Sequence, residues 1–255
     1  MNDADEARYE RERAFHDERY GDDPDRARAE KFYEAGNESA AQYRAVLATV
    51  TSGTRVLEYG CGTGSAAFDL AARGAEVLGI DISTVAIAAA TAEAVQRGLG
   101  AGLRFEAMNA EALPLPADSF EVVCGSGVLH HLDLARALPE VARVLRPDGW
   151  AVFVEPLGHN PLINAYRRRT PEMRTPDEHP LRLDDFALAR RHFGIVEVEY
   201  FNLLTIATVP LRRLGIQRGL RAGLHRVDQW LFRLVPPLRQ HAWVAVVRLG
   251  ASRAG

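Results

Sequence analysis

The sequence contains few cysteines and no excess of positive charge. Cys61 and Cys124 are the only cysteines among 255 residues, too few for a disulfide framework. A reducing, cytoplasmic compartment is therefore the simplest expectation. The 31 basic and 34 acidic residues leave a net charge of −3, whereas a general nucleic-acid binder normally has a basic surplus. We therefore expect no nucleic-acid partner.

Long apolar runs are also missing. No stretch reaches the length of a membrane span, and the charged residues 1–6 are unlike a signal peptide. Hydrophobic residues make up 47% of the chain and charged residues 25%, which is ordinary for a globular protein. The length suits one α/β domain with additions.

The most informative segment follows an apolar stretch that ends at Glu58. Glycines then alternate at Gly60, Gly62 and Gly64, and such glycines let a backbone approach a ligand closely. Dinucleotide sites use the different spacing G-x-G-x-x-G and hold a pyrophosphate. An acid at Glu58 would repel a pyrophosphate but suits the ammonium group of S-adenosylmethionine (SAM), so we expect Glu58 at the methionine end of that ligand.

A second apolar strand, 76–81, ends at Asp81. An acid at the end of the second strand of a βαβ unit can accept hydrogen bonds from both ribose hydroxyls. A glycine-rich turn alone could be a plain connection between elements. The combination of Glu58, the three glycines and Asp81 favours a SAM site instead.

These segments resemble the class I SAM-dependent methyltransferases of the small-molecule type. The resemblance spans roughly residues 50–156 and continues through the segments 105–114, 119–125, 128–132 and 143–150. It departs at Asn109, where the family usually has Asp, and at Asp148, where it usually has Gly. Asn can still accept a hydrogen bond from an adenine amino group.

The resemblance implies SAM as cofactor and S-adenosylhomocysteine as product. The residues that it assigns to the cofactor are Glu58, Gly60, Cys61, Gly62, Gly64, Asp81, Ile82, Asn109, Ala110, Glu111 and Gly125.

Strand and helix patterns alternate along the middle of the chain. Strands are expected at 54–59, 75–80, 103–107, 120–124 and 150–155, with helices at 66–73, 84–98 and 134–145. This alternation predicts a parallel sheet with helices on both faces. The stretches 193–201 and 242–249 read as further strands, which in the family close the sheet as an antiparallel pair.

The predicted fold class is therefore α/β, with a seven-stranded, mostly parallel, doubly wound sheet of the class I methyltransferase type. We divide the chain into a helical N-terminal cap (1–45), a SAM-binding core (46–156), and a C-terminal part (157–255) with substrate loops, a helical lid insertion and the last two strands. The cap carries aromatic residues among its charges, which favours contact with core or ligand over a solvated extension.

The lid insertion, 203–239, is apolar and carries seven arginines against one acid, Asp228. A basic amphipathic helix can contact a membrane surface or an anionic partner. A lid with solvated arginines is the plainer alternative. Peripheral membrane contact through this segment stays open.

Ligands of open α/β sheets bind beyond the C-terminal strand ends, which selects Glu155, His159 and, by resemblance, His131 as catalytic candidates. A general base is needed only if the acceptor holds its proton, and His131 could equally be a packed core histidine. An arginine of 167–169, or Arg174, could hold an anionic acceptor group. We expect no metal site, since the adjacent histidines should diverge and no further ligand cluster follows.

The expected function is methyl transfer from SAM to a small or lipid-like acceptor, with O-, N- and C-methylation all open. One alternative is a SAM-binding regulatory module without turnover, and another is a methyltransferase acting on a peptide. The acceptor pocket should be bounded by His131, the 155–160 loop and the 203–239 lid, with the 1–45 cap closing it. The sequence leaves the oligomeric state open.

Overall fold

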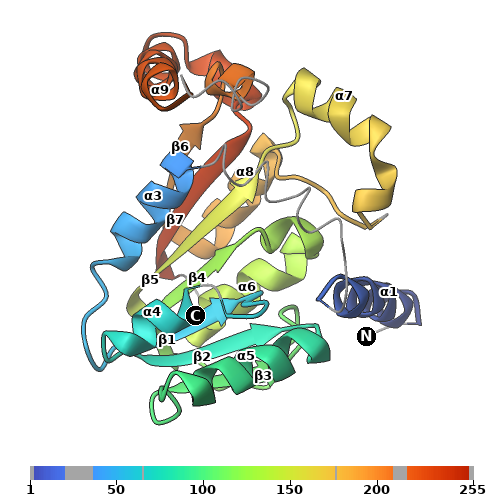
Figure 1. Ribbon diagram of the computed structural model, residues 1–255, viewed down its shortest axis with the longest axis vertical. Coiled ribbons are helices and arrows are strands. Elements are labelled where there is room, and N and C mark those ends of the chain that lie inside the picture. The colour runs from blue at the N-terminus through green and yellow to red at the C-terminus, as the bar shows by residue number, and fades with distance from the viewer. Residues whose placement is uncertain (1–2, 21–36, 65, 176, 209–216, 253–255) are drawn as a thin grey trace.

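The computed structural model describes residues 3–20, 37–64, 66–175, 177–208 and 217–252. Its centre is a seven-stranded sheet in the order β3-β2-β1-β4-β5-β7-β6 (Figure 1). The strands are β1 (Arg55–Tyr59), β2 (Glu76–Asp81), β3 (Leu103–Ala107), β4 (Phe120–Ser126), β5 (Leu145–Pro156), β6 (Phe193–Phe201) and β7 (Val244–Ser252). Strands β1 to β5 are parallel, and β7 runs antiparallel to both β5 and β6. The predicted fold class is confirmed.

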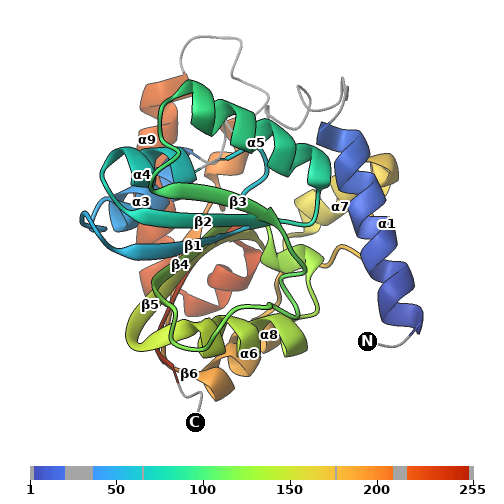
Figure 2. The same ribbon diagram turned by 90° about the horizontal axis from the view of Figure 1, so that it is seen from below.

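Both faces of the sheet are buried, because successive side chains of a strand point to opposite sides. In β1, Val56 belongs to one apolar core, while Leu57 and Tyr59 belong to the other. Figure 2 shows α3 (Asn37–Leu47), α4 (Ala67–Ala72) and α5 (Thr84–Gln96) on one face of the sheet, and α6 (Leu134–Val144) and α8 (Leu183–His192) on the other. Helices on both faces explain why the inner strands are apolar almost throughout.

Strand β5 begins earlier than the sequence pattern predicts. The fifth strand was expected at 150–155, but Leu145 is fully buried and already pairs with Phe120 of β4. The register then shifts, so that Trp150 pairs with Val122. The residues between these two pairs, which include the exposed Asp148, therefore form an irregularity within β5.

The expected N-terminal cap is helical in its described residues. Helix α1 (Asp3–Tyr20) stands clear of the sheet beside the C-terminal strand ends (Figure 1). Its Asp17 accepts hydrogen bonds from the Ser83 hydroxyl (2.6 Å) and the Val85 N–H (3.2 Å) at the start of α5. Arg11 forms a two-pronged contact with Asp177. Polar contacts with distant segments thus position α1. Residues 21–36 of the predicted cap lie outside the described residues.

Both cysteines are buried and free, as expected. Cys124 lies on β4 beside Glu58 of β1, and Cys61 follows β1 directly. Burial raises the pKa of both thiols above their usual value. The thiols therefore stay protonated and pack as small apolar side chains.

The C-terminal insertion contains α9 (Gln217–Leu234) and a short 3-10 helix, η5 (Pro236–His241). Gln229 of α9 donates to the Tyr200 carbonyl of β6, Phe232 is buried in a core, and Arg221 pairs with Glu38 of α3. Figure 1 shows α9 beyond the β6 side of the sheet, away from α1. Residues 209–216 of the predicted lid lie outside the described residues.

Asp228, the single acid of this insertion, is fully buried. Its carboxylate accepts hydrogen bonds from the backbone N–H groups of Leu203 (3.1 Å), Leu204 (2.8 Å) and Thr205 (3.3 Å), and from the Thr205 hydroxyl (3.0 Å). Its role is to anchor the chain that leaves β6 onto α9.

We expect Asp228→Ala to lower the free energy of unfolding by about 3 kcal/mol or more, because buried donors to a charged group lose their acceptor. Urea denaturation followed by circular dichroism measures this. Asp148→Ala, which removes an exposed carboxylate, is the control and should change stability little. Equal stability of the two variants would contradict the anchoring role of Asp228.

Candidate cofactor and acceptor site

A cavity of about 1240 Å³ lies at the C-terminal ends of the parallel strands. One wall is a single face of α1, because its lining residues recur every three or four positions. These residues are Asp5, Arg8, Tyr9, Glu12, His16, Arg19 and Tyr20. The predicted closure by the N-terminal cap is thus supported by the position of α1. None of the described residues of 203–239 lines the cavity, so the lid role of that segment stays a prediction without support from their position.

The glycine loop after β1 requires glycine for conformational reasons. Gly60, Gly62 and Gly64 have φ angles of +59°, +52° and +94°, which other residues rarely adopt. A Cβ at Gly60 would also lie 2.7 Å from Cγ2 of Val128. Gly60 therefore presents bare backbone to the cavity that it lines.

Glu58 has a structural role that the sequence did not reveal. Its Oε1 accepts from the Ala66 N–H (2.8 Å) and its Oε2 from the Ala67 N–H (2.9 Å), at the start of α4. A carboxylate at a helix N-terminus satisfies free N–H groups and complements the helix dipole. Glu58 is not among the lining residues. Its expected contact with the methionine end of SAM stays a prediction.

Asp81 reaches the cavity from the end of β2. Its Oδ2 accepts from the Gly62 N–H (2.8 Å) and its Oδ1 from the Ser83 N–H (2.9 Å), so the carboxylate also pins the glycine loop. Ile82, Asn109, Ala110 and Glu111 join Asp81 in the lining. The structure therefore gathers most of the polar residues that the resemblance assigned to the cofactor.

Other residues that the resemblance assigned to the cofactor do not line the cavity. Cys61, Gly62, Gly64 and Gly125 are not among the lining residues. At Gly125 a Cβ would lie 2.9 Å from Cγ1 of Val128. Gly125 is thus required for close packing under the cavity floor, and a direct contact with the cofactor stays a prediction for these four.

Glu111 joins the cap to the core. Its Oε1 accepts from the Asp133 N–H (2.8 Å), and its Oε2 pairs with Arg8 of α1. Arg136 lies 3.8 Å from the same oxygen and also pairs with Asp5 of α1 at 2.7 Å. An acid assigned to the cofactor site therefore also holds α1 in place.

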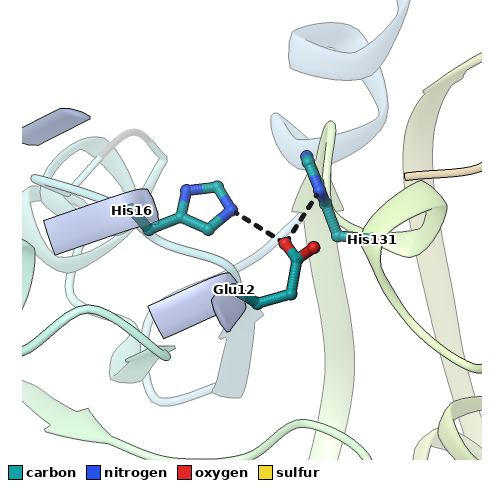
Figure 3. A group of neighbouring side chains, drawn as sticks. All are labelled: Glu12, His16 and His131. Carbon is teal, nitrogen blue, oxygen red and sulfur yellow. Dashed lines mark ion pairs between the residues drawn. The ribbon is translucent and has the colours of Figure 1, made fainter. Parts of the chain in front are cut away.

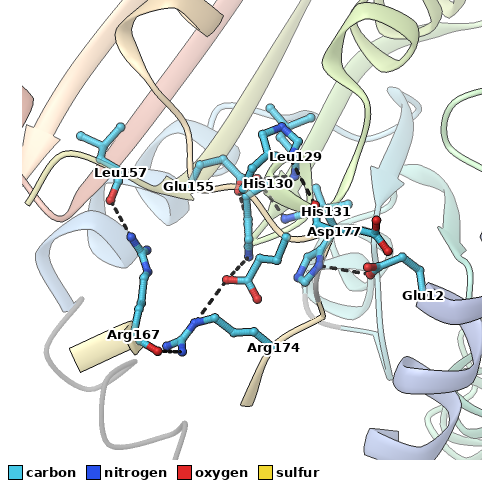
Figure 4. Close-up of polar contacts among 12 residues, drawn as sticks. Glu12, Leu129, His130, His131, Glu155, Leu157, Arg167, Arg174 and Asp177 are labelled. Carbon is cyan, nitrogen blue, oxygen red and sulfur yellow. Dashed lines mark hydrogen bonds and ion pairs between the residues drawn. The ribbon is translucent and has the colours of Figure 1, made fainter. Parts of the chain in front are cut away.

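Glu155 and His130 form a buried pair (Figure 4). Oε1 of Glu155 accepts from the N–H groups of Val128 (3.0 Å) and Leu129 (2.8 Å), while Oε2 lies 2.8 Å from Nδ1 of His130. Burial lowers the pKa of His130 and raises the pKa of Glu155. A neutral imidazole that donates from Nδ1 fits this environment. Glu155 thus positions the turn after β4.

His131 follows on that turn, in the 3-10 helix η2 (Leu129–His131), and lines the cavity. Its Nδ1 lies 3.4 Å from Oε2 of Glu12 on α1 (Figure 4). Burial lowers the pKa of His131 below its usual value. A largely uncharged imidazole at the cavity wall can accept a proton, as a base must.

His159 is not brought to the cavity. Its Nε2 accepts from the Leu183 N–H at 3.4 Å, and of the predicted 155–160 loop only Glu155 and Pro156 are lining residues. A catalytic role for His159 therefore stays a prediction without support from its position.

The sequence reasoning missed Glu12 and His16. Their spacing of four residues on a helix places both on one face, which was the available signal. Arg167, foreseen as an anion-binding candidate, does line the cavity. Its Nη1 donates to the Leu157 carbonyl (3.1 Å) and to Asn164 (3.2 Å), and burial lowers its pKa to about 10.

Comparison with known proteins agrees with this geometry. The family described as "Methyltransferase domain" matches residues 57–153. An uncharacterized methyltransferase, YcgJ of Bacillus subtilis, is 32% identical over 48% of this chain and 49% of that protein. The ubiquinone/menaquinone biosynthesis C-methyltransferase UbiE of Xanthomonas campestris is 40% identical over 45% of this chain and 47% of that protein. The chain thus spans about half the length of these relatives.

Among solved structures, phosphoethanolamine N-methyltransferase 2 of Haemonchus contortus superimposes with a TM-score of 0.63 at 19% identity, over 84% of this chain and 53% of that one. This likeness shows a shared fold. Residues 57–153 therefore match a methyltransferase domain, and the described residues share the class I methyltransferase fold.

Proposed function

We propose that the whole protein transfers a methyl group from SAM to a small or lipid-like acceptor held in the cavity beneath α1. The observation that carries this proposal is the shared cavity: Gly60, Asp81 and Asn109 line the same space as His131. A regulatory module would need the cofactor surface alone. A peptide acceptor is less favoured because α1 covers the site.

The lining fits the cofactor on two counts. Gly60 offers bare backbone, and Asp81 offers a nearly buried carboxylate that can accept hydrogen bonds from ribose hydroxyls. Asn109 and Ala110 lie beside them for the adenine. The bound sulfonium supplies an activated methyl group.

The protein's own contribution is alignment and exclusion of water. Helix α1 covers the site, and His131 can take a proton from an acceptor that holds one at neutral pH. Met108, Leu132 and Ile163 add apolar surface to the lining. Arg167 and Arg174 can hold an anionic acceptor group. The names of the quinone-biosynthesis relatives also support an acceptor with substantial apolar surface.

Replacing Asp81 tests the cofactor part of the proposal. Asp81→Asn should weaken SAM binding by about tenfold or more, because charge-assisted hydrogen bonds contribute roughly 1.5–3 kcal/mol. Isothermal calorimetry measures the affinity. Glu76→Gln, which removes an exposed carboxylate at the other end of β2, is the matched control. The cofactor assignment fails if Asp81→Asn binds SAM like the control.

Replacing the two candidate histidines tests the acceptor part. Release of S-adenosylhomocysteine is measured with a panel of phenols, amines and carboxylates that carry apolar tails. With the accepted compound, His131→Gln should lower kcat by about 10²-fold or more and leave SAM affinity nearly unchanged. His159→Gln should retain turnover, since His159 lies outside the cavity lining. Loss in His159→Gln alone would place the acceptor elsewhere, and no release with any compound would favour the regulatory alternative.

A second proposal concerns peripheral membrane contact through 203–239. Exposed apolar residues Val227, Trp230 and Leu234 recur at helical spacing on α9, and Trp230 and Leu234 are 59% and 60% exposed. Arg226 and Arg233 are exposed beside them, while the acid of α9, Asp228, is buried. A basic, apolar helix face of this kind suits an anionic lipid surface. Among the described residues, no helix is long and apolar enough to cross a bilayer.

Sedimentation with phospholipid vesicles tests this contact. Binding should appear with vesicles that contain anionic lipid, fall with added salt, and be weakened severalfold by Trp230→Ser. Val95→Ser is the control, because Val95 is an even more exposed apolar residue, on α5. The contact is ruled out if anionic vesicles bind nothing, or bind both variants alike.

A further inference from the structure

Three side chains that the sequence did not connect converge at the wall of the cavity (Figure 3). Oε2 of Glu12 lies 3.4 Å from Nδ1 of His131 and 3.6 Å from Nε2 of His16. One ligand atom from each residue lies within 4.8 Å of the other two. This is a cluster of one carboxylate and two imidazoles.

Two helical elements carry all three side chains. Glu12 and His16 lie four residues apart on α1, which places them on one face of the helix. His131 lies on η2, which Glu155 holds through its hydrogen bonds with Val128 and Leu129. The cluster is therefore built by the docking of α1 onto the turn after β4.

Glu12 is a buried carboxylate with unused acceptor capacity. It is only 4% exposed, and neither of its oxygens has a hydrogen-bond partner among the described residues. Nδ1 of His131 also has none. Contacts of 3.4 and 3.6 Å are longer than ordinary hydrogen bonds of about 2.7–3.2 Å. A buried charge in this condition calls for a cation that can approach all three groups.

The separations of 3.4 and 3.6 Å between Glu12 and the two imidazoles match those of ligands around one metal ion. Zinc binds His nitrogen and carboxylate oxygen at about 2.0–2.2 Å in a tetrahedral arrangement, which separates the ligand atoms by about 3.4 Å. Two imidazoles with one carboxylate also suit zinc better than magnesium or calcium, which prefer oxygen ligands. We propose that Glu12, His16 and His131 bind a divalent transition-metal ion, with zinc as the best fit.

A second group, His130, His131 and Glu178, is less suited to the ion. Nδ1 of His130 is already bound by Glu155, and its Nε2 lies 3.9 Å from Glu178. The Glu178 carboxylate lies 3.6 Å from the guanidinium of Arg174. We expected no metal because we considered His130 and His131 without α1. Glu12 and His16 of α1 complete the favoured cluster.

The position of the cluster gives the ion a role. Glu12, His16 and His131 all line the cavity, and three protein ligands leave a tetrahedral ion one further position. With the ion bound, His131 would act as a ligand and not as a free base, and an acceptor hydroxyl bound at the open position would have a lowered pKa. This role rests on the proposed function and favours a hydroxyl-bearing acceptor, whereas metal binding itself does not depend on it.

The experiment titrates chelator-treated, full-length protein with Zn²⁺ by calorimetry, without SAM or acceptor. One equivalent should bind, and Co²⁺ should give the visible absorption of a tetrahedral site. Glu12→Gln and His16→Gln should each weaken Zn²⁺ binding at least about a hundredfold, since loss of mere supporting partners already costs 10–100-fold. If Glu12→Gln fails to fold by circular dichroism, His16→Gln, at a less buried position, decides the result.

Two matched controls keep the test specific. Glu10→Gln changes a neighbouring acid of α1 that pairs with Arg13, and His192→Gln changes a histidine at the end of α8. Both should bind Zn²⁺ like the parent protein. The proposal is overturned if the parent binds neither ion, or if Glu12→Gln and His16→Gln bind like the controls. Either failure leaves the methyltransferase proposal intact, because no methyl transfer is measured.

Discussion

The docking of α1 across the C-terminal strand ends is the contact on which the whole site depends. This helix supplies one wall of the cavity and two of the three clustered ligand atoms. Its attachments are mainly polar: Asp5 to Arg136, Arg8 to Glu111, and Asp17 to Ser83. A partly exposed ion pair such as Asp5–Arg136 contributes only about 0–1 kcal/mol. The cap is therefore held more weakly than the sheet, which suits an element that covers a ligand site.

Beneath α1, the turn after β4 is held far more firmly. The Glu155 carboxylate is fully buried and uses both oxygens, one for two backbone N–H groups and one for His130. Networks of satisfied buried polar groups are stiff, because breaking one bond leaves a charge unpaired. The turn after β4, which carries His131, is therefore rigid. Helix α1, which carries Glu12 and His16, covers it and is held mainly by polar contacts.

The same contrast explains how acids are used in this chain. Glu58 was predicted to bind the ligand, and Asp228 was noted only as the one acid of an arginine-rich segment. Each is buried and satisfies backbone N–H groups, at the start of α4 and after β6 respectively. Asp81 does both, since it pins the glycine loop and still lines the cavity. A buried carboxylate of this chain can therefore bind a ligand only if it also lines the cavity while it accepts hydrogen bonds from the backbone.

Much of the fold was predictable from the sequence. Alternating strand and helix patterns predicted all seven strands within a few residues, except for the early start of β5, where buried Leu145 extends the pairing. The glycine loop and Asp81 were predictable because they depend on local conformation and short spacing. The placement of α9 was not, since an apolar arginine-rich segment can cover a ligand or pack beside β6 with the same pattern.

The sequence by itself determined the sheet, the glycine loop and the acid at the end of β2, because side-chain period and turn chemistry act over a few residues. Only the tertiary structure decided that Glu12 and His16 meet His131, that Glu58 caps α4, and that His159 stays outside the cavity. The physical reason is that these outcomes depend on which distant elements pack together. Local patterns carry no information about that packing.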